Sequence, residues 1–311
     1  MENRYAVMDL GTNTFHLLIA EGIITDFRTI VHEHIAVKIG EGGINNGTIT
    51  PAAFQRGLDT MKSFAKLIEA NNVRKTRCVA TSALRNASNG RDFIDQVKAE
   101  TGIGIDLIDG GKEAALIYED IKAAEATSSA NSLIMDIAGG SIEFIIGNNE
   151  QMIWKQSFEI GAARLMERFH HTEPISPASV EALDHYLEDT LQPLFDAVKE
   201  NPVHQLIGSS GSFETFAELA ARRRDDNFDL EKVKNYVFDY EDLLYVTDEM
   251  IVSNHMEREA NELIIPVRTD MIVVSSVVTR FILSRLDIRN VSLCTYSLKE
   301  GVLAEMMEDN I

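Results

Sequence analysis

Cysteine, proline and long apolar runs are all scarce in this sequence. Two cysteines among 311 residues, Cys78 and Cys294, are too few to build a disulfide framework or a zinc site. Six prolines mark no Pro-rich linker. The longest apolar stretches, such as residues 271–274, are far shorter than the roughly 18 residues of a membrane span. The first residues show no secretory signal, so we expect a cytoplasmic protein with no membrane segment.

Positive charge is also in short supply. The sequence holds 29 Lys and Arg residues against 49 Asp and Glu residues, which gives a net charge of −20. Nucleic-acid-binding proteins carry basic faces that neutralise phosphates, so the charge argues against nucleic acid as a partner. The charge does not exclude a phosphate-bearing substrate, because backbone amides, helix N-termini and a bound divalent cation can hold phosphate inside an acidic protein.

An internal repeat indicates two related domains, as does the length at roughly 150 residues per domain. Residues 9–20 read DLGTNTFHLLIA, and residues 136–147 read DIAGGSIEFIIG. Each stretch follows a short apolar run, and each combines an Asp, a turn of small residues and a second apolar run. This pattern predicts a β-hairpin at the start of each domain.

Helical patterns follow both hairpins. Thr50-Pro51 and Ser176-Pro177 each combine an N-cap residue with a proline at the first helical position. Apolar residues at helical spacing follow both pairs, in the second case as far as Leu194. Residues 291–301 predict a short strand and then a helix from Leu298. Strands that alternate with helices indicate an α/β protein.

The two hairpin turns are the first candidates for chemistry. Small residues let backbone N–H groups approach an anion, and a carboxylate at the strand end suits a hydrated divalent metal. Taken alone, the first stretch is better explained by an ordinary hairpin turn, because turn residues are common, but its repetition favours a pair of phosphate loops. The first candidate set is Asp9, Gly11, Thr12, Asn13 and Thr14. The second set is Asp136, Gly139, Gly140, Ser141 and Glu143, whose two acids stand on opposite limbs of the hairpin.

Three further segments each allow two interpretations. Arg85 follows a strand and a hydroxyl-rich turn, where it can bind a phosphate or form a surface salt bridge. Glu113 falls in the first turn of a predicted helix. There its negative charge can stabilise the helix by interacting with the positive end of the dipole, or the carboxylate can act as a general base on water. A loop of small residues precedes another predicted helix. It can bind an anion at the helix N-terminus, or it can simply connect a strand to that helix. The loop consists of Gly208, Ser209, Ser210, Gly211 and Ser212.

The histidines show no spacing that is typical of metal ligands. His170-His171 and the pair His32 and His34 lack further ligands at helical spacing, and His16 lies in an apolar run. We therefore expect them to be solvated or core residues. The acidic run at residues 305–309 is predicted to be a solvated tail.

Taken together, the motifs resemble those of the exopolyphosphatase / guanosine pentaphosphate phosphohydrolase (Ppx/GppA) family, in its short two-domain form. They come in order along nearly the whole chain, and the ordered set is more specific than any one motif. The motifs are DLGTNT at 9–14, ATSALR at 80–85, GGKEA at 110–114, DIAGGSIE at 136–143, GAARL at 161–165, GSSGS at 208–212, RTDMI at 268–272 and LKEG at 298–301.

The resemblance implies the actin/hexokinase (ASKHA) fold, which is α/β with two ribonuclease H-like domains and an interdomain cleft. The first domain is expected to comprise residues 1–122 and 297–311, because the terminal helix returns to it. The second domain is expected to comprise residues 123–296. The chain has no His-Asp dyad of the additional helical domain that longer relatives carry.

The activity that the resemblance implies is Mg²⁺-dependent hydrolysis of terminal phosphate from polyphosphate, or of the 5′ γ-phosphate of pppGpp. Mn²⁺ is an alternative cation. By position, Glu113 matches the glutamate that activates water, and Arg85 matches an arginine that faces the phosphates. Asp136 and Glu143 match an acidic pair that binds metal and water, with Asp9 as a further metal ligand. The phosphate-binding residues match the two hairpin loops and the loop at 208–212.

Three positions depart from the family pattern. Ala138 stands where the family usually has a glycine, and a Cβ is tolerated poorly at positive φ. Ile142 replaces a usual threonine. Lys112 replaces an acid, and it is expected either to lower the pKa of Glu113 or to bring positive charge to the phosphates.

The net charge does not decide whether the substrate is a long polyanion or a short nucleotide. A long chain bound to a protein of charge −20 needs a positive groove, which a second subunit in a homodimer can complete. The candidate residues for that groove are Arg85, Arg91, Arg164, Arg168, Arg258 and Arg268. Two other functions stay open as well. One is a kinase of the same superfamily, and the other is a non-catalytic regulator that binds nucleotide or alarmone.

Overall fold

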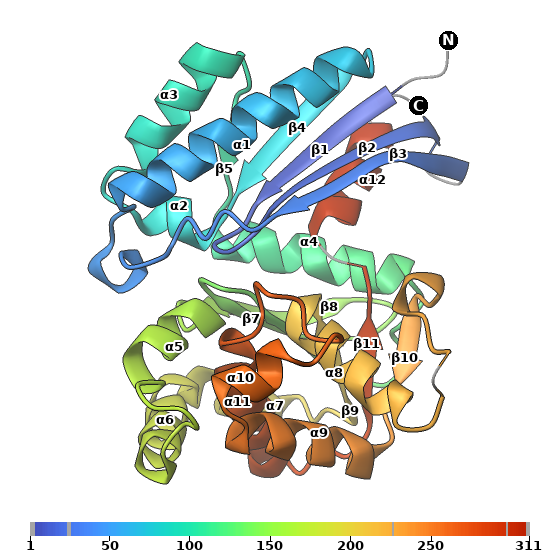
Figure 1. Ribbon diagram of the computed structural model, residues 1–311. Helices are drawn as coiled ribbons and strands as arrows, with labels where there is room; N and C mark the ends of the chain where they lie inside the picture. Colours follow the sequence, from blue (N-terminus) through green and yellow to red (C-terminus); the bar gives the residue numbers. More distant parts are fainter. Residues whose placement is uncertain (1–3, 24–25, 226, 297, 309–311) are drawn as a thin grey trace. The chain divides into compact units, whose positions relative to one another are not determined.

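The computed structural model describes residues 4–23, 26–225, 227–296 and 298–308. The chain divides into two compact units. Unit 1 comprises Met1–Leu116 and Leu298–Ile311, and unit 2 comprises Ile117–Ser297. The division falls inside one continuous helix, α4 (Gly110–Ala123), whereas the family resemblance places it at the end of that helix. Each unit is built on its own sheet (Figure 1).

The sheet of unit 1 has five strands in the order β3-β2-β1-β4-β5. Strands β1 and β2 form the predicted first hairpin, and β3 extends it on the antiparallel side. Strands β4 and β5 add to β1 in parallel. The bounds are β1 Arg4–Leu10, β2 Phe15–Ile23, β3 Asp26–Ile35, β4 Lys75–Ala80 and β5 Asp106–Leu107.

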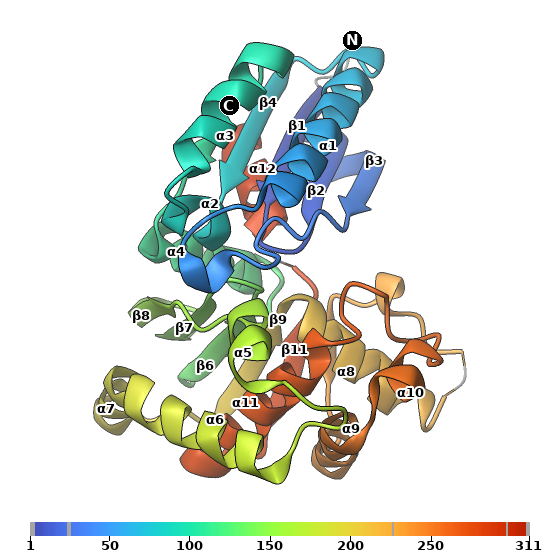
Figure 2. The same cartoon turned by 60° about the vertical axis from the view of Figure 1, so that its left-hand side comes forward.

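Helices cover both faces of this sheet (Figures 1 and 2). Alternate β1 residues such as Met8 and Leu10 pack under α1 and α3, whereas Tyr5 and Val7 pack against α12 on the other face. The period of two along a strand explains this division. The helices are η1 Ile44–Asn46, α1 Pro51–Ala70, α2 Ser82–Asn86, α3 Gly90–Thr101, the first part of α4, and α12 Leu298–Glu308.

The sheet of unit 2 has six strands in the order β10-β11-β9-β6-β7-β8. Strands β6, β7 and β8 are antiparallel neighbours, and β9 and β11 add to β6 in parallel. The bounds are β6 Ser132–Ile137, β7 Ile142–Gly147, β8 Met152–Phe158, β9 Gln205–Ser209, β10 Asn235–Val237 and β11 Val291–Cys294.

The strand orders of the two sheets confirm the internal repeat. In each sheet, three antiparallel strands formed by consecutive segments are followed by two parallel strands on the other side of the first. Strand β10 is the one addition in unit 2. This is the repeated ribonuclease H-like α/β arrangement that the resemblance implies.

The helices of unit 2 surround one large apolar core. Helix α11 is buried along most of its length, and its buried hydroxyls Ser276 and Thr279 donate to carbonyls one turn earlier. The helices are α5 Ala162–Phe169, α6 Pro177–Thr190, α7 Gln192–Glu200, α8 Ser210–Arg222, η2 Leu230–Lys232, α9 Tyr240–Val252, α10 His255–Glu259 and α11 Met271–Leu286.

Both predicted helix starts are confirmed. The Thr50 side chain accepts a hydrogen bond from the Ala53 N–H at the start of α1, and the Ser176 side chain accepts one from the Ser179 N–H at the start of α6. The second helix is shorter than predicted, because it breaks at Leu191. A new helix with proline near its start, α7, carries the rest of the apolar pattern.

The predicted solvated tail is wrong for Glu305. This residue lies in α12, where its carboxylate pairs with Arg77 at 2.6 Å and with Lys112 at 2.7 Å. Residues 309–311 lie outside the described part of the chain. None of the helices in the described ranges is both long and apolar enough to span a membrane.

Candidate active site

The first phosphate loop is the tight turn between β1 and β2. Its closing hydrogen bond joins the Gly11 N–H to the Thr14 carbonyl at 3.1 Å. The carbonyls of Thr12 and Asn13 accept from the Gly40 and Lys38 N–H groups, so a second segment of unit 1 holds the turn from outside. Backbone hydrogen bonds therefore fix the shape of this loop.

Asp9 stands in β1 just before that turn. It pairs in register with His16 on β2 and with Val79 on β4. Its side chain is half-buried. Burial raises the pKa of the neighbouring Cys78 thiol well above its ordinary value, and the charge of Asp9 adds to the effect. Cys78 is therefore a protonated core residue without nucleophilic character.

Arg85 and Glu113 come together inside unit 1. Arg85 lies in the short helix α2, and its Nη1 donates to the Ile108 carbonyl at 2.9 Å and to Glu113 Oε2 at 3.3 Å. The two side chains are 18% and 5% exposed. The salt bridge considered for Arg85 is therefore present, but it lies largely buried and not on the surface.

Glu113 occupies the first turn of α4, as predicted. The Asp109 carboxylate caps the helix by accepting from the Lys112 N–H at 2.8 Å. Lys112 itself points to Glu305 of α12, with Nζ 2.7 Å from the carboxylate. The prediction that Lys112 acts on Glu113 or on phosphate finds no support in this contact, because its ammonium group is used to hold α12.

The second phosphate loop lies in unit 2, between β6 and β7. Asp136 and Glu143 are direct cross-strand partners, so their side chains leave the same face of the hairpin. They are 5% and 0% exposed. Ser157 of β8 donates its hydroxyl to Glu143 Oε1 at 2.6 Å. Two adjacent buried carboxylates with oxygen donors match the ligand preference of Mg²⁺.

The N-terminus of α5 sets the orientation of this loop. The N–H groups of Gly161, Ala162 and Ala163 donate to the carbonyls of residues 140, 138 and 139 at 2.9–3.2 Å. In a trans peptide the carbonyl and the following N–H point in opposite directions. The N–H groups of residues 139, 140 and 141 therefore all point away from α5. Three parallel N–H donors form a cradle of the kind that binds anions.

Two side chains complete the description of the loop. The Ser141 hydroxyl is buried and has no hydrogen-bond partner among the described residues, as expected of a group that awaits a ligand. Ala138 does not have a positive φ angle, so its Cβ is tolerated where the family usually has glycine. The loop instead requires a glycine at 161, where an added Cβ would lie 2.4 Å from the backbone of Gly139 and Ser141.

The predicted loop at 208–212 is a direct strand-to-helix junction. Gly208 and Ser209 end β9, and Ser210 begins α8 with a φ of +66°. The Ser210 hydroxyl donates to the Ile137 carbonyl at 2.9 Å, which ties the junction to the strand before the second phosphate loop. The Ser212 hydroxyl bonds to Ser275 of α11 at 2.9 Å. Both hydroxyls are therefore used within unit 2.

A sequence model of the Ppx/GppA phosphatase family matches residues 18–310. The chain belongs to that family. A solved exopolyphosphatase from Cytophaga hutchinsonii is 40% identical, with a TM-score of 0.94, and the match covers 99% of this chain and 98% of that one. The family and this relative make the protein a phosphatase.

More distant Ppx/GppA structures show the same fold. The Aquifex aeolicus family member is 23% identical, with a TM-score of 0.81 and full coverage of both chains. An exopolyphosphatase-like protein is 23% identical, with a TM-score of 0.90 and coverage of 99% of each chain. The two-unit fold is thus retained across this range of identity.

The arginines expected to line a groove have different surroundings. Arg258 is fully buried and pairs with Glu173, so its place in a groove is a wrong prediction. Arg168 stacks on Tyr186, and Arg91 pairs with Asp95 on an exposed helix face. Arg164 donates to the Gly140 carbonyl at 2.8 Å, directly behind the second phosphate loop of this Ppx/GppA protein.

Arg268 lies against Gly211 and pairs with Glu214 at 2.6 Å. A Cβ at Gly211 would meet its guanidinium at 2.5 Å, so the GSSGS motif provides space for this arginine.

Ser157 is a site residue that the motifs did not reveal. It lies opposite Glu143 on β8, and it reaches the carboxylate because cross-strand partners share a face. Side chains alternate between the two faces of the hairpin, and extending this alternation to the next strand would have identified Ser157.

Proposed function

We propose that this phosphatase is an exopolyphosphatase, which removes the terminal phosphate of inorganic polyphosphate by attack of water. The observation that carries the proposal is the cradle of three parallel N–H groups at residues 139–141, with two buried carboxylates beside it. The 40% identical relative described as an exopolyphosphatase supports polyphosphate as the substrate.

In this proposal each hairpin loop offers donors that can bind phosphate oxygens. The second loop offers its three N–H groups and the Ser141 hydroxyl, and the first loop offers the hydroxyls of Thr12 and Thr14. Such donors stabilise the charge that develops on the transferring group, and their backbone is fixed before the substrate arrives.

Asp136 and Glu143 fit a divalent cation, because two adjacent buried carboxylates need a compensating positive charge. We assign them as Mg²⁺ ligands. Asp9, beside the first phosphate loop of unit 1, is likewise assigned as a carboxylate that can bind Mg²⁺. The cation neutralises phosphate oxygens when it is bound.

Glu113 is assigned as the general base. Its carboxylate takes a proton from water, the water oxygen forms a bond to the terminal phosphorus, and the bridging P–O bond breaks. Orthophosphate and a chain shorter by one phosphate leave. Arg85, which holds Glu113 from the side, fixes the carboxylate and provides a positive charge for the phosphate oxygens.

The test measures phosphate release with Mg²⁺ from long-chain polyphosphate and from pppGpp in parallel. We expect Glu113→Gln to lower kcat by about 10²–10⁴ with little change in substrate affinity, because only the proton acceptor is lost. Glu119→Gln, an exposed site farther along α4, is the matched control. Near-normal turnover by Glu113→Gln would refute the assignment of Glu113 as the general base. If the wild type bound a substrate without turning it over, a regulatory function would be favoured.

The second candidate substrate is pppGpp. The net charge of −20 favours it, because a short nucleotide approaches an acidic protein with less repulsion than a long polyanion. Faster turnover of pppGpp than of polyphosphate in the parallel assay would select this substrate and leave the roles of the residues unchanged. Transfer of phosphate to an acceptor other than water would indicate a kinase.

A further inference from the structure

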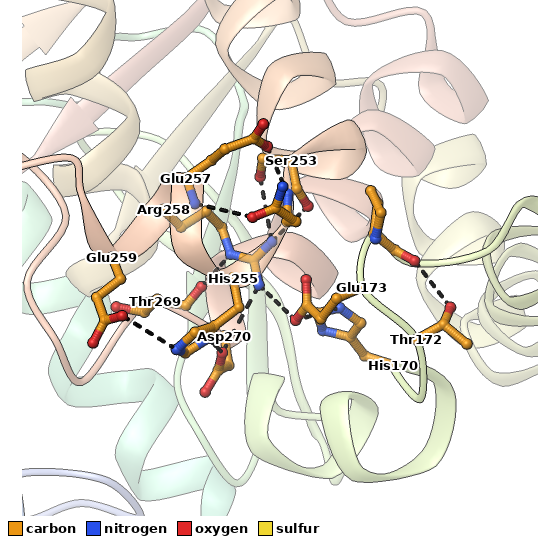
Figure 3. Close-up of polar contacts among 12 residues, drawn as sticks. His170, Thr172, Glu173, Ser253, His255, Glu257, Arg258, Glu259, Thr269 and Asp270 are labelled. Carbon is orange, nitrogen blue, oxygen red and sulfur yellow. Dashed lines mark hydrogen bonds and ion pairs between the residues drawn. The ribbon is translucent and has the colours of Figure 1, made fainter.

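A group of histidines and carboxylates in unit 2 lies around the buried guanidinium of Arg258 (Figure 3). Three segments supply it. Glu173 follows α5, His255 begins α10, and Asp270 immediately precedes α11. None of these residues belongs to the two phosphate loops.

Three of these side chains can share one cation. Glu173, His255 and Asp270 each offer one donor atom, and the three atoms lie within 4.8 Å of one another. His255 Nδ1 is 2.6 Å from Asp270 Oδ1. The three side chains are 37–45% exposed, so an ion can reach them from solution.

His170 provides an independent sign that a ligand belongs here. Its side chain is only 3% exposed, and Nε2 lies 3.2 Å from Glu173 Oε1 without making a hydrogen bond. The ring is hydrogen-bonded to the backbone of Asp270, and that bond must belong to Nδ1. Because the bond to the Asp270 backbone occupies Nδ1, the buried Nε2 is the ring nitrogen that remains for a ligand, and it lies beside the Glu173 carboxylate.

The charged groups around Arg258 carry more negative than positive charge, which favours binding of a cation. Arg258 Nη2 is 2.7 Å from Glu173 Oε1 and 3.8 Å from Asp270 Oδ1. One guanidinium faces two carboxylates, so the group keeps a net negative charge. Arg258 also donates to the carbonyls of Ser253 and Thr269, and these bonds hold it in place.

We propose that Glu173, His255, Asp270 and His170 form a binding site for a divalent transition-metal ion of the Zn²⁺ class. Two imidazoles and two carboxylates suit Zn²⁺, whereas Mg²⁺ prefers oxygen ligands and several waters. The ion would join the segment after α5 to α10 and to the start of α11, so its role is structural.

The surroundings of the histidines match those of metal ligands. Ligating histidines commonly donate their second ring N–H to a backbone carbonyl or a carboxylate. His170 does so to Asp270, and His255 Nε2 faces Glu259 at 4.0 Å. When a metal takes the lone pair of His255 Nδ1, the ring proton resides on Nε2, beside the Glu259 carboxylate.

The test titrates the EDTA-treated full chain with Zn²⁺ in the presence of millimolar Mg²⁺. Calorimetry gives the affinity, thermal unfolding gives stability, and Co²⁺ absorption reports coordination by four ligands. We expect Zn²⁺ to raise Tm by about 5–10 °C at a hundredfold excess over Kd. Catalytic turnover is not a readout, so the result does not depend on the proposed function.

Two variants locate the ion. His255→Ala removes a half-exposed ligand without opening the core, and it should weaken Zn²⁺ binding at least about tenfold. His34→Ala is the control, because His16, His32 and His34 form a second histidine group in unit 1. Loss of binding in His255→Ala alone supports the site. Equal affinity of His255→Ala and wild type, no Zn²⁺ binding at all, or loss only in His34→Ala overturns it.

Discussion

Gly161 shapes the second phosphate loop from a position outside it. Its φ of −61° is open to any residue, so a glycine is needed here for space alone. The backbone of Gly139 and Ser141 would lie 2.4 Å from a Cβ at this position. The close approach lets the N–H groups of Gly161, Ala162 and Ala163 reach the loop carbonyls, and this turns the loop N–H groups toward the other side.

We expect Gly161→Ala to push the loop away from α5 and to lower phosphatase turnover at least tenfold. Overpacking of this kind costs about 1–3 kcal/mol of stability, so the protein should remain folded. Steady-state kinetics and thermal unfolding measure the two effects. Gly104→Ala is the control, because its Cβ meets only the Lys98 ammonium at 3.8 Å. Unchanged kinetics in Gly161→Ala would show that the loop tolerates the displacement.

At the residue scale, the sequence alone identified the acidic and small residues of the candidate site, but it did not predict how these residues are arranged. Asp136 and Glu143 stand out because the hairpin register follows from the repeat. The direction of the loop N–H groups could not be predicted, since it depends on hydrogen bonds from Gly161 and its neighbours. His170 was expected to be a solvated or core residue, because it lacks further ligands at helical spacing, and only the fold brings Glu173, His255 and Asp270 near it.

The carboxylate of Glu305 in helix α12 forms ion pairs with Arg77 and Lys112 of unit 1. Burial raises the pKa of the Glu305 carboxyl, but hydrogen bonds and charges from Lys112 and Arg77 outweigh this effect, and the pKa falls below its ordinary value of 4.5. A lowered pKa in the folded state means that the charged form contributes stability above that ordinary value. The contribution is lost as the pH falls through the folded-state pKa.

We expect Glu305→Gln to lower Tm by about 1–4 °C at pH 7, because partly exposed ion pairs contribute about 1 kcal/mol or less. The difference from wild type should shrink as the pH falls below the ordinary pKa of 4.5, where the wild-type carboxylate takes up a proton. Thermal unfolding across this pH range measures it. Glu69→Gln, at an exposed position of α1, should show no such trend. A pH-independent difference would contradict the ion-pair explanation.

At the element scale, capping signals predicted helix starts well. Thr50 and Ser176 cap the helices that their sequence pattern indicated. Breaks and junctions were harder to predict. The apolar spacing runs through Leu191 without a change of period, although the backbone breaks there. Residues 208–210 join a strand to a helix directly, and Gly208 lies so close to the Phe213 ring that an added Cβ would meet it at 2.1 Å.

For the whole molecule, the internal sequence repeat predicted the fold better than the amino-acid composition did. Two sheets with the same order of strands follow from one hairpin pattern found twice. The division inside α4 could not be predicted, because a continuous helix carries no boundary signal. Unit 1 is discontinuous in sequence, and its second core face needs α12.

Removal of residues 298–311 should unfold unit 1 and spare unit 2. Helix α12 buries Leu298, Val302, Leu303, Met306 and Met307 on the sheet. At about 1.5–3 kcal/mol per side chain, their loss is comparable with the whole stability of a domain. Limited proteolysis followed by mass spectrometry should recover a protected fragment close to residues 117–297. Equal protection of both units in the shortened chain would contradict this expectation.

The return of α12 to β1 also sets an order of events during protein synthesis. Unit 2 is one continuous stretch of chain, and all of it is synthesised before residue 298 is added. The strands of unit 1 emerge first, yet the face that carries Tyr5 and Val7 lacks its cover until residues 302–307 have been made. Nascent chains usually fold from the N-terminal domain onward. In this protein the unit that is translated first is the last to be completed, and its uncovered face is a surface that a chaperone can bind in the interval.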